Sequence, residues 1–306
     1  MTLTELKYIV TLAQEQHFGR AAKKCFVSQP TLSVAIKKFE ESLDVIIFER
    51  RKNKVQITDI GQKIVQQAQQ VLESAEKIKQ LAKADHNPLQ QTLRMGAIHT
   101  VGPYLFPHLI PAINKLAPDL SLIIEENYTA KLREKLANGE LDIIIIALPF
   151  SSRQVKVLPI YRENFDVIIP AGHAWKNKKV ISPDDFIDES VLLLGEGNCF
   201  RDQVLQACPT CALHAEPETR SEKMVVGSSL ETIRYMVATG LGVSVLPRSA
   251  TQQAYKNKLV LTKPFRKPEP FRDIALAYRE SFTRPAVLDL LTQAINKMVM
   301  KGAELL

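Results

Sequence analysis

Residues 142–148 read DIIIIAL and place four consecutive isoleucines in one short run. A strand with one face in water alternates apolar and polar residues, so an unbroken apolar run predicts a strand that is buried on both faces. Residues 191–195 (VLLLG) and 242–247 (GVSVLP) show the same pattern. Strands of this kind are typical of parallel sheets with helices packed on both sides. We therefore expect an α/β region built around such a sheet.

The remaining pattern after residue 88 alternates strands with helices. Strands are predicted at 92–98, 121–127, 142–148, 165–170, 191–195, 242–247 and 273–279, and helices at 103–115, 129–138, 200–208, 229–239 and 285–300. About 215 residues of this kind predict two α/β subdomains, which we place at 88–164 with 270–306 and at 165–269. Ligands of such folds bind where strands end and helices begin, and Thr100 and Thr129 follow the first two strands.

The N-terminal residues are basic and helical. Residues 20–54 hold nine Lys/Arg and four Asp/Glu, a local charge of +5 in a chain whose net charge is +7. Two helices precede a third that Ser28 caps, and two short strands follow it as a basic wing. We predict a winged helix-turn-helix over residues 1–58, in which short polar groups read base edges and basic side chains neutralise phosphates. The candidate DNA-binding residues are Ser28, Gln29, Pro30, Thr31, Ser33, Lys37, Lys38, Arg50 and Arg51.

A long amphipathic helix is predicted to join the two regions, with Thr58 as its cap and residues 59–87 as the linker. Its apolar residues repeat at heptad spacing: Ile64, Ala68, Val71, Ala75, Ile78 and Ala82. A single apolar stripe on an otherwise polar helix favours pairing with a second chain. The alternative is that the stripe packs on the chain's own body. A dimer would place two recognition helices on two half-sites of double-stranded DNA.

Three of the four cysteines, Cys199, Cys208 and Cys211, lie within residues 195–211. If the predicted helix between the first two is unbroken, their Cα atoms are about 13 Å apart at the usual helical rise. A disulfide needs Cα atoms within roughly 7 Å, so this bond requires the helix to unwind. Cysteines that can form a disulfide only when a helix unwinds are a candidate redox switch. The alternative is that the three cysteines are unrelated small residues without a redox role.

Composition limits the other classes of function. The N-terminus has neither the basic start nor the cleavage site of a secretory signal, and no run of eighteen apolar residues occurs. We therefore expect a cytoplasmic protein without membrane partners. Thiols are normally reduced there, so a disulfide would be transient. The six histidines, His99 and His108 among them, lack metal-ligand spacing. The sequence also lacks a nucleophile elbow and a phosphate-binding loop. We therefore expect that the protein binds no metal and no cofactor and is not an enzyme.

Residues 18–51, FGRAAKKCFVSQPTLSVAIKKFEESLDVIIFERR, closely resemble the signature of LysR-type transcriptional regulators. The shared parts are the paired alanines, SQPTLS, IKKFE and FER, and the resemblance continues along the whole chain. It implies an α+β protein: a winged helix-turn-helix, a linker helix, and a regulatory region (88–306) resembling a type 2 periplasmic binding protein. It also implies promoter DNA as a partner, a homodimer through the linker helix, a homotetramer, and RNA polymerase as a further partner of an activator.

Within this family the regulatory region resembles the sensors of hydrogen peroxide. The resemblance rests on residues 100–105 (TVGPYL), on Gly197, Cys199 and the following RDQ, on Cys208, and on 267–270 (KPEP). It implies that Cys199 reacts with peroxide and Cys208 resolves the product as a disulfide. It implies further that Thr100 and Thr129 seat peroxide and that Arg272 stabilises the thiolate.

Elementary chemistry is consistent with these roles, because the nucleophile is a thiolate and oxidation gives a sulfenic acid that a second thiol condenses. A helix N-terminus and Arg201 both favour the thiolate of Cys199. Two residues depart from the sensors' pattern. Asn198 stands where they often have His, and an amide cannot carry a proton. Cys211 creates a CPTC sequence, so Cys208 has a second candidate partner.

Two other functions remain open at this point. A LysR-type regulator could bind a small metabolite between its subdomains, with the cysteines incidental. A thiol peroxidase or disulfide oxidoreductase would use the same cysteines, but the basic module and the heptad helix argue against it.

Overall fold

The computed structural model describes residues 1–51, 54–82, 89, 91–212, 226–252 and 258–306. The side chains of Arg50, Arg51 and Cys211 lie outside the described residues. None of the described helices is long and apolar enough to cross a membrane.

The N-terminal module contains three helices and a two-stranded wing, as the sequence predicts. These are α1 (Leu3–Glu15), α2 (Phe18–Lys24), α3 (Gln29–Leu43), β1 (Phe48–Arg51) and β2 (Lys54–Ile57). Thr2 and Glu5 form a capping box on α1. The Ser28 hydroxyl accepts the backbone N–H of Thr31 at the start of α3, so the predicted cap of the recognition helix is present.

The linker helix α4 (Asp59–Ala82) starts where Thr58 accepts the N–H of Gly61 at 2.9 Å. Part of the heptad stripe is occupied within the chain, because Ala68 is buried in the core of the N-terminal module and Ile64 and Val71 pack against that core. Farther along the helix Ile78 is 69% exposed. The first half of the stripe therefore packs on the chain's own module, whereas Ile78 in its second half is exposed.

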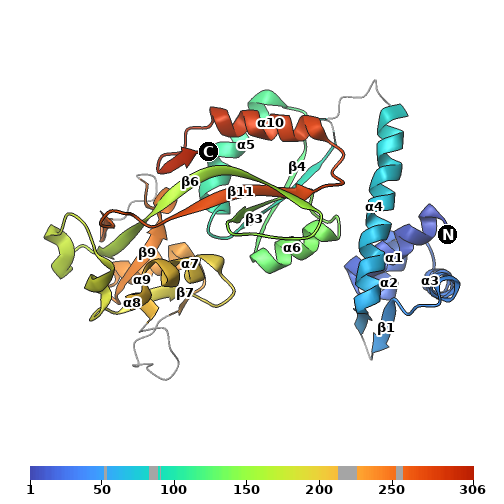
Figure 1. The fold of residues 1–306 in the computed structure, drawn as a ribbon, viewed down its shortest axis with the longest axis horizontal. Helices are drawn as coiled ribbons and strands as arrows, with labels where there is room; N and C mark the ends of the chain where they lie inside the picture. The colour runs from blue at the N-terminus through green and yellow to red at the C-terminus, as the bar shows by residue number, and fades with distance from the viewer. Residues whose placement is uncertain (52–53, 83–88, 90, 213–225, 253–257) are drawn as a thin grey trace.

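The regulatory region is built on a 10-stranded sheet. Its path runs β4 (Leu122–Asn127), β3 (Leu93–Ile98), β5 (Ile143–Ala147), β11 (Phe271–Arg279), β6 (Val155–Pro170), β9 (Val243–Pro247), β7 (Val191–Leu194) and β8 (Val226–Gly227), and β10 (Val260–Pro264) and β12 (Ala303–Leu305) also pair with β6. Helices α5 (Gly102–Leu116) and α10 (Pro285–Lys297) cover one side of the first half and α6 (Thr129–Ala137) the other (Figure 1). The four isoleucines of β5 are fully buried, as their pattern predicts.

The prediction of a parallel sheet is correct only at the two ends. β3 pairs parallel with β4 and β5, and β7 pairs parallel with β8 and β9. In the middle β11 is antiparallel to β5 and to β6, and β6 is antiparallel to β9. The reason is the path of the chain: it leaves the first half along β6 and returns along β11, so these two strands run in opposite directions (Figure 1).

Two separate cores fill this region. The first is formed by residues between Leu93 and Tyr161 together with residues between Ile274 and Met300. The second collects residues between Phe165 and Phe265 together with Tyr104 of α5, and it includes residues of helices α7 (Cys199–Ala207) and α9 (Leu230–Ala238). We propose subdomain boundaries at 88–164 with 270–306 and at 165–269, and these two cores support them.

A buried ion pair crosses between the two cores. Arg272 of β11 and Glu163 of β6 have side chains that are 0% exposed, and Arg272 Nε donates to Glu163 Oε1 at 2.9 Å. The other carboxylate oxygen of Glu163 accepts the backbone N–H of Ser249 in the second half. Arg272 also donates to the hydroxyl and the carbonyl of Thr100. The guanidinium of Arg272 and the carboxylate of Glu163 therefore connect β6 and β11 to both halves of the region.

The N-terminal part of the chain also contacts the regulatory region. Arg279 Nε of β11 lies 2.7 Å from Glu73 Oε1 of α4, and both side chains are largely buried. The same guanidinium donates through Nη1 to the carbonyls of Leu136 and Leu141. Gln14 of α1 donates to the carbonyl of Asn138, which follows α6. β11 thus touches Thr100 near one end and the linker helix at the other.

We expect Arg272→Met to lower the free energy of unfolding of the regulatory region by about 3–5 kcal/mol, because Glu163 would stay buried without its cation. Urea unfolding followed by the fluorescence of Trp175, which lies in the second core, measures this. Arg162→Met is the matched control: it breaks a partly exposed pair with Asp273 and should cost much less than Arg272→Met. The double variant Arg272→Met/Glu163→Gln should be less unstable than Arg272→Met. If the double variant lost as much free energy of unfolding as the two single variants together, that would contradict a buried charge pair.

The carboxylate of Glu269 makes the stability of this region depend on pH. Burial raises the pKa of Glu269, but hydrogen bonds from Arg248 and Asn164 outweigh burial and hold it below the ordinary 4.5. A pKa lowered by folding gives stability that is present above the unfolded value and lost as the pH falls through the folded value. The urea midpoint of the wild type should exceed that of Glu269→Gln at pH 6, and the difference should vanish below the lowered pKa. A difference that stays constant down to acid pH would contradict this.

Candidate functional site

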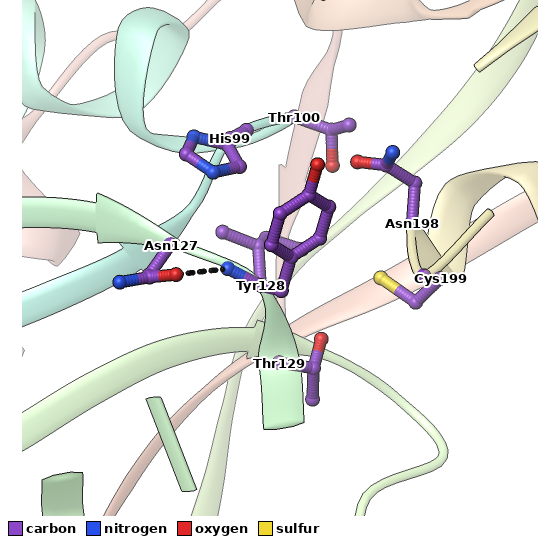
Figure 2. Close-up of a pocket in the computed structure, with 9 residues that line it drawn as sticks. His99, Thr100, Asn127, Tyr128, Thr129, Asn198 and Cys199 are labelled. Carbon is purple, nitrogen blue, oxygen red and sulfur yellow. Dashed lines mark hydrogen bonds between the residues drawn. The ribbon is translucent and has the colours of Figure 1, made fainter. Parts of the chain in front are cut away.

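Cys199 lies in a small cavity between the two halves of the regulatory region. The cavity has a volume of about 10 Å³ and is lined by Ile98, His99, Thr100, Asn127, Tyr128, Thr129, Gly197, Asn198 and Cys199. Figure 2 shows these side chains converging from the ends of β3 and β4 and from the loop before α7. Four predicted site residues, Thr100, Thr129, Asn198 and Cys199, are therefore brought together at the carboxyl ends of strands.

Cys199 is the first residue of α7 and is a free thiol. It is half-buried and packs against the first core, whereas Phe200, the next residue, is buried in the second core. The loop that delivers it contains Gly197 with φ +85°, a left-handed conformation that glycine adopts without strain. The thiol thus lies at the boundary between the halves, at the positive end of a helix dipole.

Thr100 is buried, and its position is set by Arg272. Arg272 Nη1 donates to Thr100 Oγ1 at 2.9 Å and Nη2 donates to the Thr100 carbonyl at 2.8 Å. The guanidinium carbon also lies 4.8 Å from the centre of the Phe200 ring, a cation–π distance. Arg272 is not among the residues that line the cavity. It acts one layer behind, where it orients the Thr100 hydroxyl and packs on the residue after Cys199.

Thr129 opens α6 on the opposite wall. Its Oγ1 is buried and has no hydrogen-bond partner among the described residues. A buried hydroxyl without a partner is costly, and in native proteins such groups are often found at functional sites. Thr129 Oγ1 therefore offers a donor and an acceptor to a small polar molecule in the cavity.

Asn198 and Arg201 both donate to backbone carbonyl groups. Asn198 occupies the N-cap position of α7, but its side chain does not cap the helix; its Nδ2 donates to the carbonyl of Gly195 at 2.9 Å. Arg201 donates through Nη1 to the carbonyl of Leu194 and does not line the cavity. Its guanidinium is thus engaged with the end of β7. Sequence proximity could not show this, because the third residue of a helix points away from the first by about 200°.

Cys208 follows α7 directly as its C-cap and is fully buried in the second core. With the helix intact, about 13 Å separate its Cα atom from that of Cys199. In this structure Cys208 is disulfide-bonded and Cys199 is free, so these two cysteines are not joined. The alternative partner from the sequence, Cys211, has a side chain outside the described residues.

Sequence reasoning missed the outer part of this cavity. His99 Nδ1 lies 3.8 Å from Glu126 Oε2, and the His99 ring contacts the Tyr128 ring edge-on at 5.2 Å between centroids. Burial raises the pKa of the Glu126 carboxyl, and the neighbouring His99 lowers it by less. The sequence does contain a signal, since His99 and Tyr128 each precede a threonine that follows a predicted strand.

The recognition helix α3 presents its polar residues to solvent. Gln29, Pro30, Thr31, Lys37 and Lys38 are exposed, and Ser33 is half-buried. The Ser28 hydroxyl lies 2.7 Å from that of Thr31, so both belong to the helix cap as well as to this surface. The predicted contribution of Arg50 and Arg51 falls on side chains that the structure does not describe.

Comparison with known proteins agrees with this architecture. The model of the bacterial regulatory helix-turn-helix proteins of the lysR family matches residues 3–62, and that of the LysR substrate binding domain matches residues 86–299. The chain is 37% identical over 296 residues to the DNA-binding transcriptional dual regulator OxyR of Escherichia coli K12, covering 97% of this chain and 95% of that one. It is 32% identical to the HTH-type transcriptional regulator EstR of Acinetobacter baylyi, with 97% of each chain covered.

Solved structures extend the comparison. Full-length OxyR C199D from Pseudomonas aeruginosa superposes with a TM-score of 0.86 at 53% identity, over 99% of this chain and 98% of that one. A reduced form of OxyR from N. meningitidis gives 0.67 at 40% identity, over 70% and 99%. With both of its parts matched in order, the chain belongs to the LysR family of bacterial transcriptional regulators.

Proposed function

We propose that this chain is a DNA-binding transcriptional regulator that senses hydrogen peroxide through oxidation of Cys199. The observation that carries the proposal is the cavity itself: a free thiol at a helix N-terminus faces Thr100 and the unpartnered hydroxyl of Thr129. Related chains named as hydrogen peroxide-inducible genes activators support it, including one from Dickeya chrysanthemi that is 37% identical over 279 residues.

The first chemical step consumes one peroxide. The Cys199 thiolate attacks one oxygen, the O–O bond breaks, and a sulfenic acid forms while hydroxide leaves and takes a proton to become water. The threonine hydroxyls can donate hydrogen bonds to the peroxide oxygens and hold the O–O bond in line with the sulfur. Asn198 has no proton to give to the leaving oxygen, so that proton comes from elsewhere in the cavity or from solvent.

The second step joins Cys199 to Cys208 and releases water, and it requires Cys208 as a thiol. Because Cys208 is disulfide-bonded in this structure, a thiol reductant must first open that bond. The approach of the two sulfurs then requires α7 to unwind, since an intact helix holds them apart. Phe200 and Val204 of α7 are buried in the second core, so unwinding must repack that core.

Repacking of the second core connects the oxidation of Cys199 to the DNA-binding modules. The second core is tied through Glu163 and Arg272 to β11, and the far end of β11 contacts the linker helix through Arg279 and Glu73. We propose that the chain works in the cytoplasm as a dimer through α4 and as a tetramer, that oxidation changes the spacing of the DNA-binding modules, and that RNA polymerase is a further partner.

Sensing of a metabolite at the same place is less well supported. About 10 Å³ of this cavity is open to the centre of a water-sized molecule, which favours hydrogen peroxide over an organic acid of several carbon atoms. We accordingly assign peroxide, and not a metabolite, to this cavity.

We expect Cys199→Ser to abolish the transcriptional response to micromolar peroxide in a reporter assay, because serine cannot form a sulfenic acid. Cys25→Ser is the matched control, since Cys25 is a free, buried thiol of the N-terminal module and should leave the response intact. Mass-spectrometric mapping of fully reduced protein after brief peroxide treatment should find the Cys199–Cys208 disulfide. A full response from Cys199→Ser, or only a Cys208–Cys211 bond in the map, would contradict the proposed switch.

We expect Lys38→Ala to weaken binding to all duplexes and to reduce the slope of log K against log salt by about one, because one phosphate contact is lost. Gln29→Ala should instead cost about 1–3 kcal/mol on the specific operator alone, since an amide that reads a base edge is removed. Lys179→Ala, an exposed lysine of the regulatory region, is the control and should change neither quantity. Fluorescence anisotropy over a salt series measures all three, and equal slopes for Lys38→Ala and Lys179→Ala would place α3 away from the phosphates.

A further inference from the structure

Tyr128 forms the outer wall of the Cys199 cavity. It follows β4 as the N-cap of α6, and 44% of its surface is exposed, so one face meets solvent and the other meets the cavity. In Figure 2 its ring lies between His99 on one side and Asn198 and Cys199 on the other. The neighbouring Thr129 hydroxyl is directed into the space beneath it.

The Tyr128 ring lies between His99 and Gly197. His99 contacts it edge-on at 5.2 Å between ring centroids. On the opposite side, two ring carbons of Tyr128 would lie 3.7 and 3.8 Å from a Cβ added at Gly197. Tyr128 and His99 belong to the first half of the region and Gly197 to the loop of the second, so the ring bridges the boundary at which the thiol lies.

The cavity behind this ring is small. About 10 Å³ is close to the minimum that accommodates one water molecule. The other walls are the ends of β3 and β4 and the loop before α7, where Ile98, Thr100 and Asn198 are buried. Tyr128 is the largest side chain of the lining, and it is neither buried nor part of a core, so its removal enlarges the cavity at little cost to packing.

We propose that Tyr128 determines which hydroperoxides reach Cys199, by admitting hydrogen peroxide and excluding hydroperoxides that carry a bulky organic group. This inference rests on the proposed function, because it assumes that Cys199 reacts with a peroxide. The reaction is the same for both substrates: the Cys199 thiolate takes one oxygen, the O–O bond breaks, and water or an alcohol leaves after protonation. Discrimination arises because an alkyl group on the second oxygen would overlap the aromatic ring.

The experiment compares hydrogen peroxide with tert-butyl hydroperoxide on the reduced, full-length protein. The rate constant of Cys199 oxidation is measured by quenching with an alkylating reagent and mass spectrometry. In Tyr128→Ala the rate with tert-butyl hydroperoxide should rise at least about tenfold, since steric discrimination of this kind is typically worth 10–200-fold. The rate with hydrogen peroxide should change much less. Tyr128→Phe retains the ring and should keep the wild-type ratio.

A matched control is available in Tyr235, an exposed tyrosine of α9 whose replacement by alanine should leave both rates unchanged. Melting curves check that Tyr128→Ala is folded, and Tyr128→Leu supplies a second open variant if it is not. A wild-type ratio in both open variants would overturn the role of Tyr128 and leave peroxide sensing intact. So would a wild type that reacts equally with both hydroperoxides. Failure of the wild-type thiol to react with either hydroperoxide would overturn the proposed function itself.

Discussion

The buried ion pair between Arg272 and Glu163 is the interaction on which the regulatory region depends. Two charges removed from water are stable only if their hydrogen-bonding groups are satisfied, and here they are: Glu163 accepts from Arg272 and from the backbone of Ser249, and Arg272 also donates twice to Thr100. These bonds join β6, β11, the end of β3 and a segment of the second half. One pair thereby positions Thr100 beside the Cys199 thiol and connects the two halves.

Helix α7 is placed so that an intact helix and a Cys199–Cys208 disulfide exclude one another. Its first residue, Cys199, packs against the first core, while Phe200, Val204 and Cys208 are buried in the second. An intact helix keeps the two cysteines too far apart to bond. A Cys199–Cys208 disulfide would therefore cost the helix its hydrogen bonds and the second core part of its packing, a cost that the oxidation by peroxide has to offset. The Arg279–Glu73 pair connects β11, the strand that carries Arg272, to the linker helix.

Most secondary structure could be predicted because its signals are local. The apolar run of β5, the cap at Ser28, the capping box at Thr2 and the helices α5, α6, α7, α9 and α10 agree with the patterns in the sequence. The direction of β6 and β11 could not be predicted, because antiparallel pairing here follows from a chain that crosses between halves and returns. Leu43 shows the same limit on a smaller scale: its spacing on α3 predicts burial, yet 42% of it is exposed at the end of the helix.

Some features of the candidate site could likewise be predicted from the sequence, and others could not. By itself, the sequence determined the chemistry: which residue carries the thiol, that it starts a helix, and that threonines follow two strands. These depend on residue type and on neighbours in the chain. Only the tertiary structure decided the geometry: that Arg272 donates to Thr100, that Arg201 donates to the end of β7, that Asn198 does not cap its helix, and that Tyr128 lines the cavity. The physical reason is that each of these contacts joins side chains to groups that the backbone path alone brings within reach.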